Sequence, residues 1–332
     1  MSFYPSLAVA GGADFPLILQ GENFVNDVTV RIQDQLRPGR AIDNQRFEVI
    51  VSSLDIISPG MVNVTVANPN LSTALPATIE FPVVEAPSAT PLIFPGGIVS
   101  AAGFVANPMV PGSIATLFGA SVSSLVESTS GVPLVTMLGG ATLLVGDNLQ
   151  APLFFSAPTQ INFQVPWDIA VGEAVSFRMQ VGSNITQSVM VPTATHAPAV
   201  FTLEGIRPGQ GAILIANTPG MIPAPVEVSS NTRPVVRGEL LEIYATGLGP
   251  VTNPPDTGSV ATSFPLSRTV TTPSVTIGGV SAQVFYSGLA PRNVGLNQIN
   301  IKVSDDAPTG DSISLVVRIG DVDAVPVIIA VE

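Results

Sequence analysis

Three short apolar runs in this chain each stop at a glycine, as buried strands do when the backbone must turn with a positive φ angle. The runs and their glycines are Phe15 to Leu19 with Gly21, Ile114 to Phe118 with Gly119, and Leu240 to Tyr244 with Gly247 and Gly249. Some tens of residues later, each run is followed by a turn glycine that leads into a strand of period two. These later glycines are Gly60, Gly172 and Gly310. The pattern predicts three copies of one all-β unit.

The length agrees with this prediction. A chain of 332 residues is too long for one sandwich of about 100 residues and suits three. Its 30 glycines and 31 prolines fall at short intervals between Val, Ile, Thr and Phe runs, and no amphipathic helical pattern is present. We therefore predict an all-β fold of three tandem immunoglobulin-like β-sandwich domains, with boundaries at residues 1–85, 86–193 and 194–332.

Charge is scarce and unevenly placed. Charged residues make up 11% of the chain and hydrophobic residues 46%, whereas an ordinary soluble surface needs nearer a quarter charged. Ala86 to Val126 contains no Asp, Glu, Lys or Arg. Prolines and glycines interrupt every candidate membrane helix in that stretch, so we expect no membrane span there. Surface buried against another subunit is the favoured explanation.

The net charge of −12 argues against a nucleic-acid partner, because phosphates need clustered Lys and Arg. Four arginines do gather between Arg31 and Arg46, but acidic residues are interleaved with them, which is typical of a solvated, self-paired face. The chain has no cysteine, so disulfides and thiolate metal sites are not available. No signal peptide is visible at Met1 to Tyr4, and we expect a mature or truncated form or an undefined start.

The N-terminal segment alternates like a strand with one apolar face. Phe3, Pro5, Leu7 and Val9 alternate with Ser2, Tyr4, Ser6 and Ala8 ahead of a glycine pair. Two interpretations stay open at this point. The segment is the first strand of its own unit, or it pairs with a neighbouring molecule by strand addition.

Residues from Phe15 to about Glu85 resemble the IPT/TIG family of immunoglobulin-like domains. The resemblance is carried by Leu17-Ile18-Leu19-Gln20-Gly21-Glu22-Asn23-Phe24, Ser58-Pro59-Gly60 and Val62-Asn63-Val64-Thr65-Val66-Ala67-Asn68-Pro69. It implies a sandwich of roughly seven strands and no chemistry. The following stretch, Glu85 to Gly97, is proline-rich and is expected to be a stiff linker or a crossing strand.

From about Pro91 to Glu332 the chain resembles an uncharacterised C-terminal domain that recurs in secreted acidobacterial proteins. Among the matching pieces are Val110-Pro111-Gly112-Ser113-Ile114, Gln160-Ile161-Asn162-Phe163-Gln164-Val165-Pro166-Trp167, Ala197-Pro198-Ala199-Val200-Phe201-Thr202, Ile243 to Gly249 and Gln298-Ile299-Asn300. The resemblance implies export and a surface role in a bacterium, with no known activity.

The same pieces indicate an internal duplication. Ala151 to Ser156 before Gln160-Ile161-Asn162 parallels Ala282 to Ser287 before Gln298-Ile299-Asn300. The last copy has an extra segment, Gly288 to Gly295. We expect that segment to be an end loop, where binding surfaces usually lie.

Candidate chemistry is sparse. His196 is the single histidine, and no nucleophile elbow accompanies it, so a catalytic triad is not indicated. Asp305, Asp306 and Asp311 are calcium candidates, with Asp321 and Asp323 as a second set. Neither set has EF-hand spacing, and acidic turn residues commonly serve local hydrogen bonds. Trp167 could stack on a sugar, but a core or interdomain plug is favoured. No cofactor is expected.

Two hypotheses of different classes follow, together with a remote third. The first is a non-enzymatic extracellular structural protein that polymerises head to tail into a pilus-like filament, with Phe3, Tyr4, Pro5, Leu7 and Val9 at the subunit interface. The alternative is a cell-surface adhesion module that binds a carbohydrate or a protein by its end loops. A hydrolase built on His196 is the third.

Overall fold

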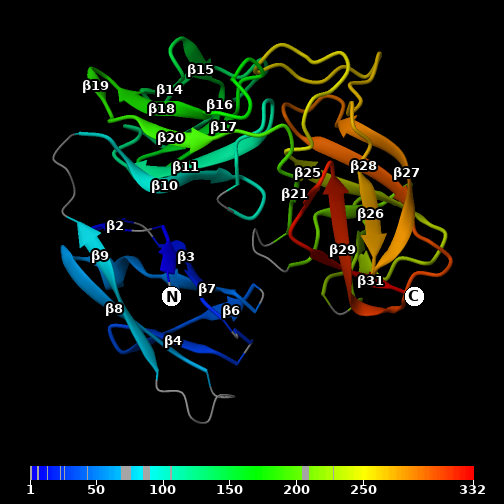
Figure 1. The fold of residues 1–332 in the computed structure, drawn as a ribbon, viewed down its shortest axis with the longest axis horizontal. Helices are drawn as coiled ribbons and strands as arrows, with labels where there is room; N and C mark the ends of the chain where they lie inside the picture. Colours follow the sequence, from blue (N-terminus) through cyan, green and yellow to red (C-terminus); the bar gives the residue numbers. More distant parts are fainter. Residues whose placement is uncertain are drawn as a thin grey trace.

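The computed structural model describes residues 2–332 except 6, 13, 23, 26, 43, 69–75, 85–89, 105–106, 204–208 and 227. Of the expected linker or crossing strand from Glu85 to Gly97, residues 85–89 lie outside the described residues, and the later part belongs to β10 (Leu92–Ser100). Three β-sandwiches follow one another along the chain (Figure 1). The described residues contain one short 3-10 helix and no α-helix, and the all-β prediction of three tandem sandwiches is confirmed.

The first sandwich holds the strands up to residue 84. One sheet has the order β1 (Ser2–Tyr4), β3 (Phe15–Gln20), β7 (Arg46–Val51), β6 (Gly39–Ala41); the other has β2 (Ala8–Val9), β9 (Ala77–Val84), β8 (Gly60–Ala67), β4 (Thr29–Ile32), β5 (Gln35–Arg37). The period-two pattern in β8 places Val62, Val64 and Val66 in the core. The 3-10 helix Ser53–Ile56 contains the buried Asp55, which is held by an ion pair with Arg37.

The second sandwich lies between residues 92 and 192. Its first sheet has the order β10 (Leu92–Ser100), β11 (Ile114–Ala120), β17 (Gln160–Gln164), β16 (Leu153–Ala157), β12 (Glu127–Ser128). Its second sheet contains β13 (Met137–Leu138), β14 (Ala141–Val145), β18 (Ala174–Val181), β19 (Asn184–Ile185), β15 (Leu149–Ala151) and β20 (Val189–Pro192). The facing aromatic rings of Phe163 and Phe177, 6.1 Å apart, join the two sheets.

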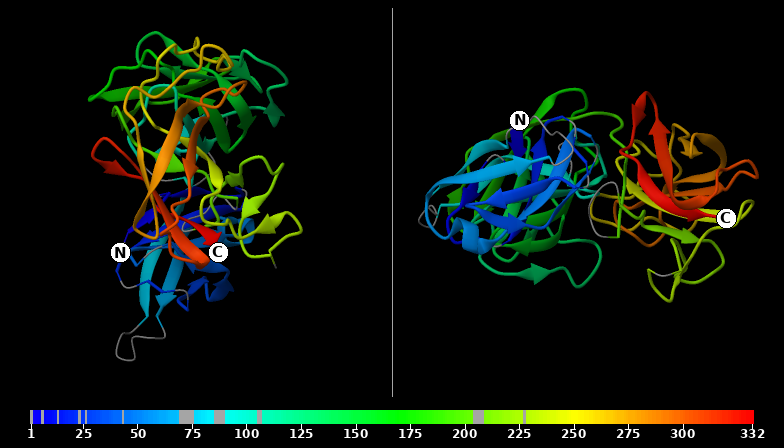
Figure 2. Two further views of the ribbon diagram at one scale, coloured as in Figure 1. Left: turned by 90° about the vertical axis from the view of Figure 1, so that its right-hand side faces the viewer. Right: turned by 90° about the horizontal axis from the view of Figure 1, so that it is seen from below.

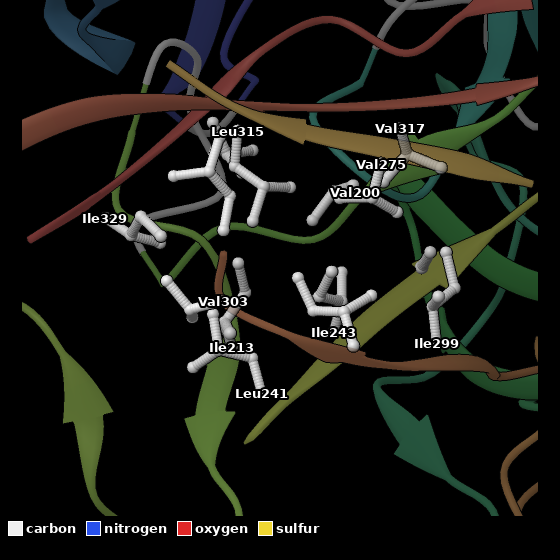
Figure 3. Close-up of a cluster of buried hydrophobic side chains, with 14 of the residues drawn as sticks. Val200, Ile213, Leu241, Ile243, Val275, Ile299, Val303, Leu315, Val317 and Ile329 are labelled. Atoms are coloured by element: carbon white, nitrogen blue, oxygen red, sulfur yellow. The ribbon is translucent and has the colours of Figure 1, made fainter. Parts of the chain in front are cut away.

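The third sandwich lies between residues 199 and 331. Its strands follow the order β21 (Ala199–Val200), β25 (Leu240–Thr246), β28 (Asn297–Lys302), β27 (Val280–Leu289), β26 (Ser274–Ile277), β29 (Gly310–Ile319), β30 (Val322–Asp323). Strand β22 (Ile213–Ile215) pairs with β25, and β31 (Val327–Val331) pairs with β29; β23 (Ile222–Pro223) and β24 (Thr232–Arg233) form a small separate pair. Its core is aliphatic, and the labelled side chains of the two faces point toward one another (Figure 3).

The second and third sandwiches pair equivalent strands in the same register. Phe118 lies opposite Gln160 in one, and Tyr244 lies opposite Gln298 in the other. In both, the glutamine amide donates to the asparagine two residues later, at 2.8 Å, from Gln160 to Asn162 and from Gln298 to Asn300. The same side-chain ladder therefore runs along the same strand of both sandwiches.

One difference separates the two sandwiches. In the second, Pro152 divides the connection into β15, which pairs with β14, and β16, which pairs with β17. In the third, the continuous β27 pairs with β26 at one end and with β28 at the other. The third sandwich is thus closed along one side by a single strand.

Two surface predictions can be compared with the fold. Much of the uncharged stretch from Ala86 to Val126 builds β10 and β11, which form the core of the second sandwich and the side that faces the first. Contact within the chain therefore accounts for part of its missing charge. No helix in the described ranges combines the length and apolarity needed to cross a membrane.

Candidate functional site

The N-terminal segment lies within its own sandwich. Ser2–Tyr4 forms β1, which pairs antiparallel with β3 so that Phe3 is opposite Leu19. The Phe3 ring meets Phe81 edge to face at 5.3 Å. Ala8 and Val9 then pair in parallel with β9 on the other sheet. In this structure the segment is a strand of its own unit, which is the first of the two interpretations left open by the sequence.

The other predicted interface residues follow from this placement. Val9 and Pro5 are buried and Leu7 is half-buried, while the side chain of Tyr4 lies outside the described part. The strand β1 is an edge of its sheet and pairs through three residues. A strand this short is held by few backbone hydrogen bonds.

The second and third sandwiches are joined by hydrogen bonds between residues far apart in sequence. The buried Gln164 of β17 accepts from the backbone N–H of Gly258 at 2.7 Å. The backbone N–H of Ile114 donates to the hydroxyl of Thr246 at 2.8 Å, and that of Leu134 donates to the Gly258 carbonyl at 2.8 Å. We call this contact the joint. Buried, satisfied polar contacts of this kind fix the relative orientation of two bodies.

Trp167 fills the joint from the side of the second sandwich. Its ring packs against the apolar cluster of Val251, Ala261 and Leu289 from the third sandwich. A Cβ at Gly112 would lie 2.2 Å from the indole, and Gly112 has φ +76°, so glycine is required there for two reasons. The indole acts as a plug between the sandwiches, and it is not displayed as a flat sugar-stacking surface.

The segment Gly288 to Gly295 also belongs to the joint. Ala290 and Val294 are buried, and a Cβ at Gly295 would come within 2.8 Å of the Gly112 carbonyl oxygen. These contacts bury part of the segment against the second sandwich. The loop does lie at one end of its sandwich, but that end faces the second sandwich.

His196 lies where the chain passes from the second sandwich to the third. Its ring is close to two glycine turns, since a Cβ would be 2.6 Å from the ring at Gly249 and 3.2 Å at Gly320. Burial lowers its pKa, and its Nε2 atom is buried with no hydrogen-bond partner in the described part. This neutral, packed imidazole has the environment of a structural residue.

The acidic calcium candidates serve turns and ion pairs. Asp306 donates its backbone N–H to the Ser304 hydroxyl, and Asp311 lies on β29. Asp323 accepts from Arg318 at 3.0 Å, and Asp321 is 3.8 Å from the same guanidinium. Among the described residues, no group of three or more His, Cys, Asp or Glu side chains is placed to hold a metal ion. Asp305 therefore lies in an acidic turn without such a cluster.

The end loops expose several apolar side chains. Phe264 is 92% exposed, and Leu125 and Val126 are 63% and 71% exposed. Exposed large apolar groups are candidates for contact with a partner. None of these three residues was singled out from the sequence, because each lies in an irregular loop where periodicity gives no signal.

Comparisons with known proteins give only distant similarities. No family model matches the chain, and no curated protein matches it. Among solved structures, it is similar to domains 5–6 of the S-layer protein SbsC, at 14% identity and a TM-score of 0.31, over 58% of this chain and 96% of that one. It is also similar to the BSP domain of a biofilm-associated protein, at 14% identity and a TM-score of 0.29, over 57% of this chain and 29% of that one.

A third similar structure is the SGBP-B protein of the Bacteroides ovatus mixed-linkage glucan utilization locus, in complex with a mixed-linkage heptasaccharide. The identity is 12% and the TM-score 0.29, over 98% of this chain and 65% of that one. The chain thus spans less than two thirds of this structure and of the biofilm-associated protein. Similarities at this level carry no argument for function.

Proposed function

We propose that this chain is a non-enzymatic structural protein of the bacterial cell exterior. The observation that carries the proposal is the joint, in which Gln164, Trp167 and Thr246 fuse two sandwiches into one body. The described residues contain no metal-binding cluster, and the single histidine is neutral and packed. A row of sandwiches with few charges and fixed joints suits a spacer or a building block better than an enzyme.

The finer proposal is assembly into a head-to-tail filament by exchange of the N-terminal strand. In an exchanged polymer, β1 would leave its own sheet and make the same pairing with β3 of the next copy. The partner is then a second copy of this chain, and Phe3 would fill the place beside Phe81 in the neighbour. If each copy donates β1 to one neighbour and accepts it from another, the contact is heterologous, and it propagates when the rotation between copies does not close. A reciprocal exchange between two copies would instead stop at a dimer.

A pair of cysteines tests the exchange directly. Ser2 and Gln20 stand opposite each other on β1 and β3. Opposite Cα atoms in an antiparallel pair are about 4.5–5.5 Å apart, which is within disulfide range. Because the chain has no other cysteine, the variant Ser2→Cys with Gln20→Cys would be locked into a ladder of covalent oligomers if strands are exchanged.

The outcomes of this experiment are distinct. A covalent ladder on a non-reducing gel, together with filaments by negative stain that disappear when residues 1–10 are deleted, would support the filament. Ser2→Cys alone is the matched control and can give dimers at most. A disulfide-locked monomer that still forms filaments would exclude strand exchange. Absence of the parent protein from the surface of the producing cell would contradict the proposal of a structural protein of the cell exterior.

Adhesion is the second candidate function, favoured by the exposure of Phe264 on an end loop of the third sandwich. Exposed aromatic rings contribute much of the contact area at binding surfaces. If the chain is an adhesion module for a surface glycan or protein, it should sediment as a monomer and bind a glycan array. Phe264→Ala should then reduce binding, whereas Val270→Ala, also on an exposed loop, should not.

A further inference from the structure

A cleft of about 280 Å³ lies between the first and second sandwiches. Its wall on the first sandwich comes from the outward side of β3, where Pro16 and Ile18 alternate with the fully buried Leu17 and Leu19. The outward side of a sandwich strand is normally polar. Strand β3 is therefore apolar on both sides, and its second apolar side lines the cleft.

The opposite wall is built from three phenylalanines of the second sandwich, Phe94 on β10, Phe118 on β11 and Phe104 beyond them. The rings of Phe104 and Phe118 meet at 5.6 Å with an angle of 62°. Phe104 has a φ of +50°, which is uncommon for a bulky residue and costs about 1–2 kcal/mol. Strained backbone of this kind is often retained where a side chain must be aimed at a site.

Few polar groups reach the cleft. Glu48 on β7 lies opposite Ile18, is 7% exposed and belongs to the lining, and Asp14 is the second acidic residue of the lining. Burial raises the pKa of Glu48, with Arg40 on the neighbouring strand opposing that rise. Thr159 and Gln160, at the turn between β16 and β17, provide polar atoms on the other wall. An apolar cavity with a few convergent polar groups at a domain interface is the usual form of a small-molecule site.

We propose that this cleft binds a small neutral molecule that has an aromatic body and one hydrogen-bond donor. The aromatic body would lie between the phenylalanines and the outward side of β3. The ligand's donor group would donate a hydrogen bond to the carboxyl oxygen of Glu48. The volume is close to the lower end of the range of about 300–1,000 Å³ for small-molecule sites, so the ligand is compact. Anions are disfavoured by the buried carboxyl group and by the net charge of −12.

The probe for this site is N-phenyl-1-naphthylamine, a neutral aromatic amine that fluoresces in apolar surroundings. Titration of the full chain should give saturable fluorescence with one site. Thr159→Trp places an indole in the cleft and should weaken binding at least tenfold. The matched control is Ser183→Trp, an exposed residue in the turn between β18 and β19, which should bind like the parent chain.

A second variant tests the polar contact. Glu48→Leu removes the hydrogen-bond acceptor and should weaken binding of N-phenyl-1-naphthylamine about tenfold. Binding of 1-phenylnaphthalene, which has no N–H, should change less than threefold. Absence of saturable binding to the parent chain would overturn the proposal, and so would equal binding by Thr159→Trp and Ser183→Trp. If Thr159→Trp fails to fold, an equal loss for both probes in Glu48→Leu would overturn the assigned donor contact.

Discussion

The second and third sandwiches present the same structural end in two chemical forms. Register places Gly112, Gln164 and Trp167 of the second at the positions of Gly238, Lys302 and Asp305 of the third. The contacts support this equivalence of positions. A Cβ at Gly112 would meet the Trp167 ring, and a Cβ at Gly238 would be 3.4 Å from the Asp305 carboxylate. The end that joins is neutral and bulky, and the other end is charged.

Exposure follows the same division. Val110 is 1% exposed at the joined end, and its equivalent, Val236, is 42% exposed. Near Val236, Arg233 and Glu239 form an ion pair at 2.7 Å on the surface. One backbone thus carries a neutral contact face in the second sandwich and a charged, exposed face in the third, and the compared positions differ at Gln164 and Lys302 and at Trp167 and Asp305. The chain's two ends lie in the first and third sandwiches (Figure 2).

Alanine substitution of the equivalent glycines, Gly112 and Gly238, should give the largest difference in unfolding free energy between the two ends. Both have a positive φ, so alanine costs about 1–2 kcal/mol at Gly112 and at Gly238. At Gly112 the new Cβ also collides with Trp167, which adds about 1–3 kcal/mol of overpacking. Calorimetry of the full chain should therefore show a greater loss of unfolding free energy for Gly112→Ala.

Removal of the collision is the control for this prediction. Trp167→Ala combined with Gly112→Ala should be less destabilised than the sum of the two single variants, because the residues are in contact. Equal losses of unfolding free energy in Gly112→Ala and Gly238→Ala would contradict the described packing of Trp167 against Gly112.

The buried amide of the joint should give the next largest effect. Gln164→Leu leaves the Gly258 N–H without its acceptor and should cost about 1–3 kcal/mol. The equivalent change at the solvent-facing end, Lys302→Leu, should stay within about 0.5 kcal/mol. Hydrogen exchange at the Gly258 amide should accelerate in the first variant and stay unchanged in the second; acceleration in both would contradict the comparison.

The position at which Pro152 separates β15 from β16 gives a prediction with a smaller expected loss of stability. Gln283 of β27 has the register position of Pro152, since Ala282 and Ala151 hold equivalent pairings. Gln283→Pro should therefore cost only about 1 kcal/mol, as one ladder hydrogen bond is lost.

Ala282→Pro is the comparison, because ladder alternation from the two-residue turn places Ala282 at a hydrogen-bonded position opposite Val275. Its loss of unfolding free energy should exceed that of Gln283→Pro. The reverse order would show that β27 does not change sheets at residue 283.

Local patterns in the sequence predicted the fold class well. Alternating Val62, Val64 and Val66 gave the core face of β8, and Gly247 follows the end of β25 with a positive φ. Gly119 does not follow the prediction, because it lies inside β11, which continues to Ala120, and its φ is not positive. These signals work because the strand period and the turn requirement are both local.

The candidate sites were harder to predict because their contacts are not local. Gln164 meets Gly258 94 residues later, and no periodicity marks either residue. The outward-facing Pro16 and Ile18 looked like a continuation of a buried run, so the cleft was not predicted. The predicted interface at Phe3 could be recognised as a strand, but only tertiary contacts place it in its own sheet.

The smallest expected effect is the pH dependence of stability that His196 causes, at the point where the chain passes from the second sandwich to the third. Burial lowers the pKa of His196 below its ordinary value of 6.5, so the unfolded chain binds a proton more readily than the folded one. Stability should therefore be complete above pH 6.5 and fall as the pH decreases through that value. His196 is the only histidine, carboxylates with ordinary pKa values titrate near pH 4, and Glu48, whose pKa burial raises, is present in both proteins. The thermal midpoint of His196→Gln should therefore fall less between pH 7 and 5.5 than that of the parent chain. The same slope in both proteins would mean that the imidazole is solvated and does not pack against the turns at Gly249 and Gly320.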